Sequence, residues 1–85
     1  MADVKIDRVK SSNSGILGRA LSEARGHRVV LDSSSRPQLD ALTNSEAFLA
    51  GVSSCGVTLI EMHAKESGVP LTGITVTIEG ARRRG

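Results

Sequence analysis

Aromatic residues and cysteines are nearly missing from this 85-residue chain. It has no Trp and no Tyr, and Phe48 and Cys55 are the single residues of their kinds. One cysteine excludes a disulfide within the chain, and one cysteine with two histidines is too few for a structural zinc site. We therefore expect no metal and no cofactor. Because so short a chain buries little surface by itself, we expect self-association to stabilise it.

An excess of charge of one sign is also absent. Eleven basic against nine acidic residues give a net charge of +2, and three of the positive charges are Arg82, Arg83 and Arg84 at the end of the chain. Removing these three leaves eight basic and nine acidic residues. No aromatic residue lies between the arginines to stack on bases, so nucleic-acid binding is disfavoured.

Long hydrophobic runs are missing as well. The first ten residues, MADVKIDRVK, contain no apolar signal segment, and the longest uncharged apolar stretch covers residues 47–60. A helix that spans a bilayer needs about 20 apolar residues, which is more than this stretch supplies. We expect a protein with no membrane partner in the cytoplasm, where its cysteine stays reduced.

Short strands are expected in the first part of the chain. Apolar residues among charged ones suggest a strand over residues 4–10, followed by a turn at residues 11–15 (SSNSG). Residues 16–24 and 27–32 read as two further strands joined by a tight turn at Arg25 and Gly26. Residues 33–44 read as a loop, because Pro37 excludes a central strand. The expected product is an antiparallel meander.

One long helix follows. Thr43 and Glu46 fit the S/T-x-x-E capping box at a helix start, and Gly68 and Pro70 are typical of a helix end near Ser67. After Pro70, β-branched residues alternate with other residues over 74–79, which predicts a further strand. The fold class is therefore α+β, in one domain that covers residues 1–85.

The predicted helix carries no charge between Glu46 and Glu61. A helix without a polar face must be covered all round or nearly so, and nothing else in the chain reads as a second long helix. Small residues recur at Ala47, Gly51 and Cys55, which allows another backbone to approach closely. The neighbour is expected to be a second copy or another part of the polypeptide.

Cys55 is the one soft nucleophile, and two interpretations of it stay open. A free cysteine on a small-residue helix face is usually a small hydrophobic side chain. As a catalytic thiolate it needs a nearby cation, and its own helix supplies none one turn away. Arginines elsewhere in the chain are the candidates, namely Arg19, Arg25, Arg28 and Arg36. Glu46, nine residues earlier on the helix, faces away from Cys55.

Three segments together resemble the OsmC/Ohr family. Residues 43–55 read TNSEAFLAGVSSC, residues 64–74 read AKESGVPLTGI before the β-branched strand, and residues 27–32 read HRVVLD. The family has a similar order of a strand ending in H-x-x-x-x-D, a P-x-E-L-L-L-A-A-L-A-S-C helix and an A-x-x-x-G-x-P-L-x-G-V segment. The match covers about residues 22–80.

The resemblance implies an intertwined dimer whose central helices pack together. It also implies thiol-dependent reduction of organic hydroperoxides in oxidative stress defence, with Cys55 as the attacking thiolate. Glu46 matches the family's glutamate, and Arg19 is the best match for the arginine that pairs with it near the thiol. Expected partners are a second copy, a peroxide and a thiol reductant.

One departure from the family weakens this interpretation. The chain corresponds to the first half of the family fold, and it lacks the second, resolving cysteine. The two-cysteine cycle therefore cannot close within one subunit, although Cys55 can still pair with the thiol of another chain. A non-catalytic dimeric module or truncated remnant, in which Cys55 only packs, is the alternative.

Overall fold

A computed structural model describes residues 3–81, which form an α+β chain with a four-stranded sheet followed by one helix. It divides into two compact units, a sheet unit up to Asn44 and a helix unit from Ser45 onward. The arginine run at residues 82–84 lies outside the described residues.

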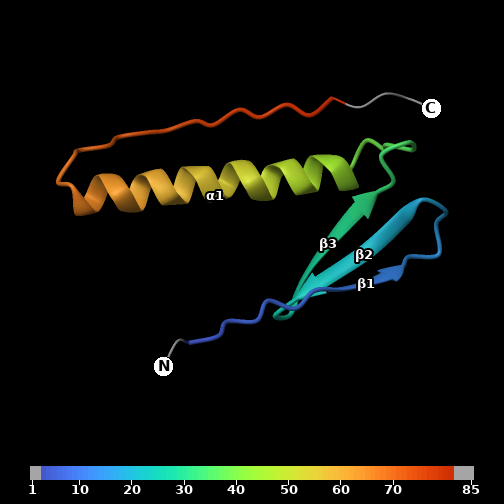
Figure 1. The fold of residues 1–85 in the computed structure, drawn as a ribbon. Helices are drawn as coiled ribbons and strands as arrows, with labels where there is room; N and C mark the ends of the chain where they lie inside the picture. The colour runs from blue at the N-terminus through green and yellow to red at the C-terminus, as the bar shows by residue number, and fades with distance from the viewer. Residues whose placement is uncertain (1–2, 82–85) are drawn as a thin grey trace. The chain divides into compact units, whose positions relative to one another are not determined.

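The sheet has the order β1-β2-β3-β4, and its first three strands form an antiparallel meander. These strands are β1 (Lys10–Asn13), β2 (Arg19–Ala24) and β3 (His27–Asp32), coloured blue to green in Figure 1. The two-residue strand β4 (Leu42–Thr43) adds to β3 in parallel. The predicted meander is therefore confirmed, with one short strand added from the segment expected to be a loop.

The turn between β2 and β3 determines the register of this hairpin. Arg25 has a φ of 53° and Gly26 a φ of 82°, the two positive values that a type I′ turn requires. Ala24 therefore lies opposite His27, and Arg19 lies opposite Asp32. The predicted tight connection at these two residues is confirmed.

Two predictions for the first strands are wrong in their bounds. The strand expected at residues 4–10 is absent from the described part of the chain, and β1 uses Lys10 to Asn13, most of which was expected to be a turn. Here tertiary pairing overrides composition, since Ser11 Oγ hydrogen-bonds Ser22 Oγ across the strands at 2.7 Å. The second strand begins at Arg19 and not at residue 16, because the left-handed Gly15 and Gly18 (φ 96° and 81°) bend the chain before it.

The predicted helix is confirmed as α1 (Asn44–Glu66), and its end follows the expected glycine signal. Gly68 has a φ of 71°, its amide donates to the Lys65 carbonyl, and the Val69 amide donates to the Ala64 carbonyl at 2.9 Å. This pair of bonds is the Schellman motif, which satisfies carbonyls that the last helical turn leaves without partners.

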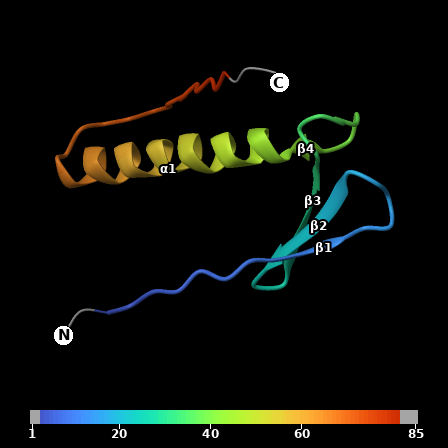
Figure 2. The same cartoon turned by 45° about the vertical axis from the view of Figure 1, so that its right-hand side comes forward.

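The strand predicted at residues 74–79 does not form within the described residues. The segment after the helix is extended and returns along α1 in both views (Figures 1 and 2), but it joins no sheet. The predicted alternation is seen only in side-chain burial, since Ile74 and Val76 are half-buried whereas Thr75 and Thr77 are exposed. A strand needs a hydrogen-bonding neighbour as well as a period of two, and sequence alternation supplies only the second.

Hydrophobic burial is low in both units. Among residues 3–81 no hydrophobic side chain is buried, and the three buried residues are the polar Ser22, Asp32 and Thr43, of which Asp32 is fully covered. No residue of α1 is buried. The cover that the uncharged helix was expected to need is therefore not provided by the described part of the helix unit itself.

Candidate functional site

The three residues expected to form a catalytic site are divided between the two units. Arg19 begins β2 in the sheet unit, whereas Glu46 and Cys55 lie on α1 in the helix unit. On the helix, nine residues separate Glu46 from Cys55, which corresponds to about half a turn of rotation and about 13 Å along the axis. These two side chains therefore leave α1 on opposite sides.

Cys55 lies at the middle of α1 and is exposed as a free thiol. Its carbonyl oxygen lies within the hydrogen-bonded helix and also accepts a hydrogen bond from Thr58 Oγ1 at 3.1 Å. One turn away on either side lie Gly51, Val52, Thr58 and Leu59, so the thiol has uncharged neighbours on its own helix. An alkyl hydroperoxide could approach it without displacing any charged group of the helix.

Arg19 is held by two carboxylates of the sheet unit. Its Nε donates to Asp32 Oδ1 at 2.8 Å and its Nη2 to Asp32 Oδ2 at 3.2 Å, so the pair is bidentate. The other side of the guanidinium donates to Asp40, with Nη2 at 2.5 Å and Nη1 at 3.3 Å. The fork geometry of arginine allows both contacts at once.

The environment of Asp32 makes this ion pair unlike a surface salt bridge. Asp32 is fully buried, and it also accepts the backbone amide of Gln38 at 3.1 Å. Hydrogen bonds from Arg19 lower the pKa of Asp32 against the opposing effect of desolvation, and they also lower the pKa of the exposed Asp40. The same bonds raise the pKa of Arg19. All three groups therefore stay charged at neutral pH.

This ion-pair cluster of Arg19, Asp32 and Asp40 is absent from the sequence-based expectations, although part of it could have been found. Once a two-residue turn at Arg25 and Gly26 is accepted, counting outward from it pairs Arg19 with Asp32. The contact with Asp40 carries no such signal, because it depends on how the loop after β3 folds back.

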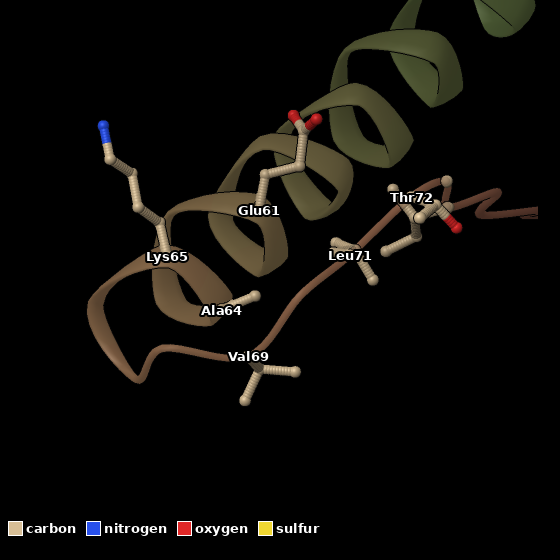
Figure 3. A pocket seen from close by; sticks show the side chains of 8 residues that line it. Glu61, Ala64, Lys65, Val69, Leu71 and Thr72 are labelled. Carbon is tan, nitrogen blue, oxygen red and sulfur yellow. The ribbon is translucent and has the colours of Figure 1, made fainter.

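A shallow groove lies in the helix unit, at the end of α1 that is far from Cys55 in the sequence (Figure 3). It has a volume of about 330 Å³ and lies between the last helical turns and the segment that follows. Ala64, Val69 and Leu71 supply its apolar wall, whereas Lys65 extends away from it (Figure 3). No cysteine or histidine lines it, and residues 3–81 contain no cluster of His, Cys, Asp and Glu that could hold a metal ion.

Two faces of α1 differ in how the helix unit covers them. On one face, the Val76 side chain lies 3.9 Å from where a Cβ on Gly56 would be, and Leu49 lies 3.4 Å from the same position on Gly80. The other face is an uncovered apolar row, which we call the open seam. It consists of Phe48, Val52, Cys55, Leu59 and Met62.

The open seam is a large exposed surface for so small a protein. Phe48 is 72% exposed, Met62 60%, Leu59 59% and Val52 46%, and Cys55 lies at the centre of the row. Beside it, a Cβ on Gly51 would meet no atom within 4 Å. Contiguous exposed apolar side chains of this kind indicate an interaction surface.

By length and composition α1 could also cross a membrane. It has 23 residues, and its most apolar 18-residue window has a mean hydropathy of 1.3. Its charge-free part, residues 47–60, is about 21 Å long, whereas the hydrocarbon core of a bilayer is about 30 Å thick. The helix therefore meets the length criterion only when its charged last turns are included.

In comparisons with protein families, curated proteins and solved structures, nothing matches this chain.

Proposed function

We propose that this protein is an OsmC-like, homodimeric thiol peroxidase of the cytoplasm that reduces organic hydroperoxides, with Cys55 as the attacking thiolate. The observation that carries the proposal is the position of Cys55, which is exposed at the centre of an apolar helix surface. The α+β order of a meander followed by a long helix is also the one that the resemblance implies.

The chemistry requires one thiol of this chain and an external reductant. The Cys55 thiolate attacks the terminal oxygen of the hydroperoxide, the O–O bond breaks, and the alkoxide leaves as an alcohol after it takes up a proton. The sulfenic acid that forms condenses with a second thiol, which releases water and leaves a disulfide. An external dithiol then reduces this disulfide to two thiols.

Two further residues have roles under this proposal. Arg19 stabilises the thiolate, and Glu46 orients the arginine, as the resemblance implies. Their conservative replacements, Arg19→Lys and Glu46→Gln, test these roles separately from that of the sulfur. Each should lower the second-order rate constant for the hydroperoxide and raise the pH at which Cys55 is alkylated.

The test is consumption of cumene hydroperoxide by the purified protein with dithiothreitol. We expect turnover by the wild-type chain and none by Cys55→Ser. As a matched control, Ser54→Ala removes a neighbouring exposed hydroxyl of the same helix and should leave the rate unchanged. A wild-type rate equal to that of Cys55→Ser would contradict the proposed activity.

A second candidate is a non-catalytic dimeric module in which Cys55 only packs. A specific observation favours it: both sides of the Arg19 guanidinium are engaged by Asp32 and Asp40. An arginine bound in this way has fewer hydrogen-bond donors left for a thiolate.

The alkylation rate of Cys55 as a function of pH separates the two candidates. A reactive thiolate should still be alkylated near pH 6, whereas a packing cysteine should react only as the pH approaches the ordinary thiol range of about 8.5. Iodoacetamide labelling followed by mass spectrometry gives the rate directly, because the chain has one cysteine.

A further inference from the structure

We infer that the open seam docks antiparallel on the same seam of a second copy, which places the two Cys55 thiols face to face. This inference rests on the homodimer proposed above and deepens it, since the second copy then supplies the resolving thiol that each chain lacks. It concerns the helix unit only, in which the seam is exposed.

The spacing of the seam favours a helix as its occupant. Its five residues follow one another at intervals of four, three, four and three, which is the pattern by which two α-helices pack side by side. Phe48, Val52, Leu59 and Met62 are all more than a third exposed in the single chain. Another molecule of this protein supplies a helix with the same spacing, namely its own α1, and it is present in any concentrated solution of the protein.

Symmetry makes the seam complementary to itself when one copy is reversed. A twofold interface requires that the same patch serve both partners. Phe48 and Met62 each lie seven residues from Cys55, whereas Val52 and Leu59 lie three and four residues from it. A twofold axis at Cys55 therefore brings Phe48 to Met62 and Val52 to Leu59, with a mismatch of about 1.5 Å in the second pair.

Charge decides between the two helix directions. Glu66 occupies the next position of the row after Met62, at the end of α1. In an antiparallel pair it lies beside the first turn of the second copy, near Ser45, where the helix dipole is positive and favours an anion. In a parallel pair, the two Glu66 carboxylates would meet at two negative helix ends. The antiparallel arrangement avoids this repulsion.

Small residues allow the two thiols to meet. Gly51 is open on its outer side, and Ser54 is exposed next to Cys55. Helix axes about 9 to 10 Å apart leave facing Cα atoms about 4.4 to 5.4 Å apart, because each Cα lies about 2.3 Å from its axis. This separation falls within the range of about 4.4–6.8 Å that a disulfide needs.

The arrangement closes the catalytic cycle between two subunits. A hydroperoxide oxidises one Cys55 to sulfenic acid and is itself reduced to the alcohol. The Cys55 thiol of the second copy attacks that sulfenic sulfur, a disulfide forms, and the hydroxyl leaves as water after it takes up the proton of the thiol. An external dithiol such as dithiothreitol restores both thiols and is oxidised to its disulfide.

Cross-linking with oxidised glutathione tests the register without any peroxide. Two variants, Val52→Cys and Leu59→Cys, are made in the Cys55→Ser background and given different masses by a tag. In the reaction, two protein thiols become a disulfide and one oxidised glutathione becomes two reduced molecules. We expect a cross-linked heterodimer when the variants are mixed, and at least about tenfold less product from either variant alone.

The alternatives give different products. A parallel pair would cross-link each variant with itself and not the mixture, and would overturn the antiparallel register. No cross-link in any sample, including the wild type, would overturn the docking itself. As a check on folding, circular dichroism of each variant should match that of Cys55→Ser.

Sedimentation supplies a second measurement with a matched control. Leu59→Asp places a carboxylate in the seam and should weaken self-association by roughly 100-fold or more. Ser54→Asp adds the same charge at an exposed position of the helix outside the five-residue row, and its effect should be less than about tenfold. Equal effects of the two variants would contradict the seam as the interface.

The outcomes also separate this inference from the proposed activity. If glutathione cross-links the variants as expected but cumene hydroperoxide gives no Cys55 disulfide, the interface stands and the peroxidase function fails. If hydroperoxide is consumed while no cross-link forms, the activity stands and the face-to-face arrangement of the thiols fails.

Discussion

The sheet unit and the helix unit differ in which side chains they bury and which they leave exposed. In the sheet unit, the buried side chains are polar, and the fully covered Asp32 is bound by Arg19 and by the Gln38 amide. In the helix unit, most large apolar side chains of α1 are exposed. The first unit therefore contains its own stabilising contacts, whereas the second has apolar surface available for another molecule.

The two units differ in whether the groups that pair with or cover their side chains belong to the same chain. A buried carboxylate is tolerated only when its counter-charge and hydrogen bonds are within reach, so the sheet unit must include them in its own chain. Apolar surface has no such requirement, because any apolar surface can cover it. Substitutions in the sheet unit should therefore lower its stability to the same extent at every protein concentration. Substitutions in the open seam should weaken self-association, so their effect should depend on protein concentration.

The largest effect is expected from removing the cation of the sheet unit. Arg19→Gln leaves the Asp32 carboxylate buried without its counter-charge, and we expect the hydrogen exchange of the Gln38 amide to accelerate by roughly tenfold or more. Arg28→Gln is the matched control, because its pair with Glu23 is 3.4 Å long and exposed. Similar exchange rates in the two variants would show that burial of the ion pair is unimportant.

The second-largest effect is expected on the helicity of the helix unit when the protein is diluted. A helix of 23 residues without buried residues is marginal in isolation, so its helicity should fall as the second copy dissociates. We expect the helical circular dichroism signal to decrease between high and low micromolar concentrations, while amide protection in β2 and β3 stays constant. A helicity that is independent of concentration would mean that α1 needs no partner.

Acid should act on the sheet unit through its two aspartates. Their pKa values are lowered in the folded state, so their contribution to stability is complete above about pH 4. It is lost as the pH falls through the lowered values, where the folded state must bind protons that the unfolded state already holds. Amide exchange in β3 should therefore accelerate below pH 4.

The control for the acid experiment is Arg19→Gln, in which this pH dependence should be much weaker. Stability of the wild-type sheet that does not change between pH 7 and pH 2 would contradict the role of the ion pair. The measurement uses the same amides as the exchange experiment above.

The smallest effect is expected at the end of α1. Gly68→Ala forces a side chain into a left-handed conformation and should destabilise the helix by about 1 kcal/mol. Gly73→Ala is the matched control, since a Cβ at Gly73 would meet no atom within 4 Å and its φ is not positive. Urea denaturation of both variants at one protein concentration measures the difference.

Local signals predicted the helix and one hairpin well. Thr43 and Glu46 at the start, with Gly68 and Pro70 at the end, bracket α1 to within one residue at each end. The pair Arg25 and Gly26 predicted the turn between β2 and β3, because few other conformations suit those positions. In each case the deciding interactions lie within a few residues of one another.

Signals that depend on distant neighbours were predicted poorly. The strand expected over residues 74–79 has the right alternation but lies along α1, and β1 uses serines that composition assigns to a turn. For the candidate site, the mid-helix position of Cys55 followed from the sequence. Its exposure did not, because the uncharged helix was expected to be covered nearly all round. The double engagement of Arg19 did not, because it depends on the loop that brings Asp40 back to β2.

The sequence by itself determined where α1 begins and ends, that its middle is uncharged, and that a single thiol lies at its centre. These properties depend on the order of residues along one helix and on its fixed period. The tertiary structure alone decided that Asp32 is buried against Arg19, and that one face of α1 is covered by Val76 while the open seam remains exposed. Contacts between distant residues depend on how the chain closes its loops, and no local spacing determines that.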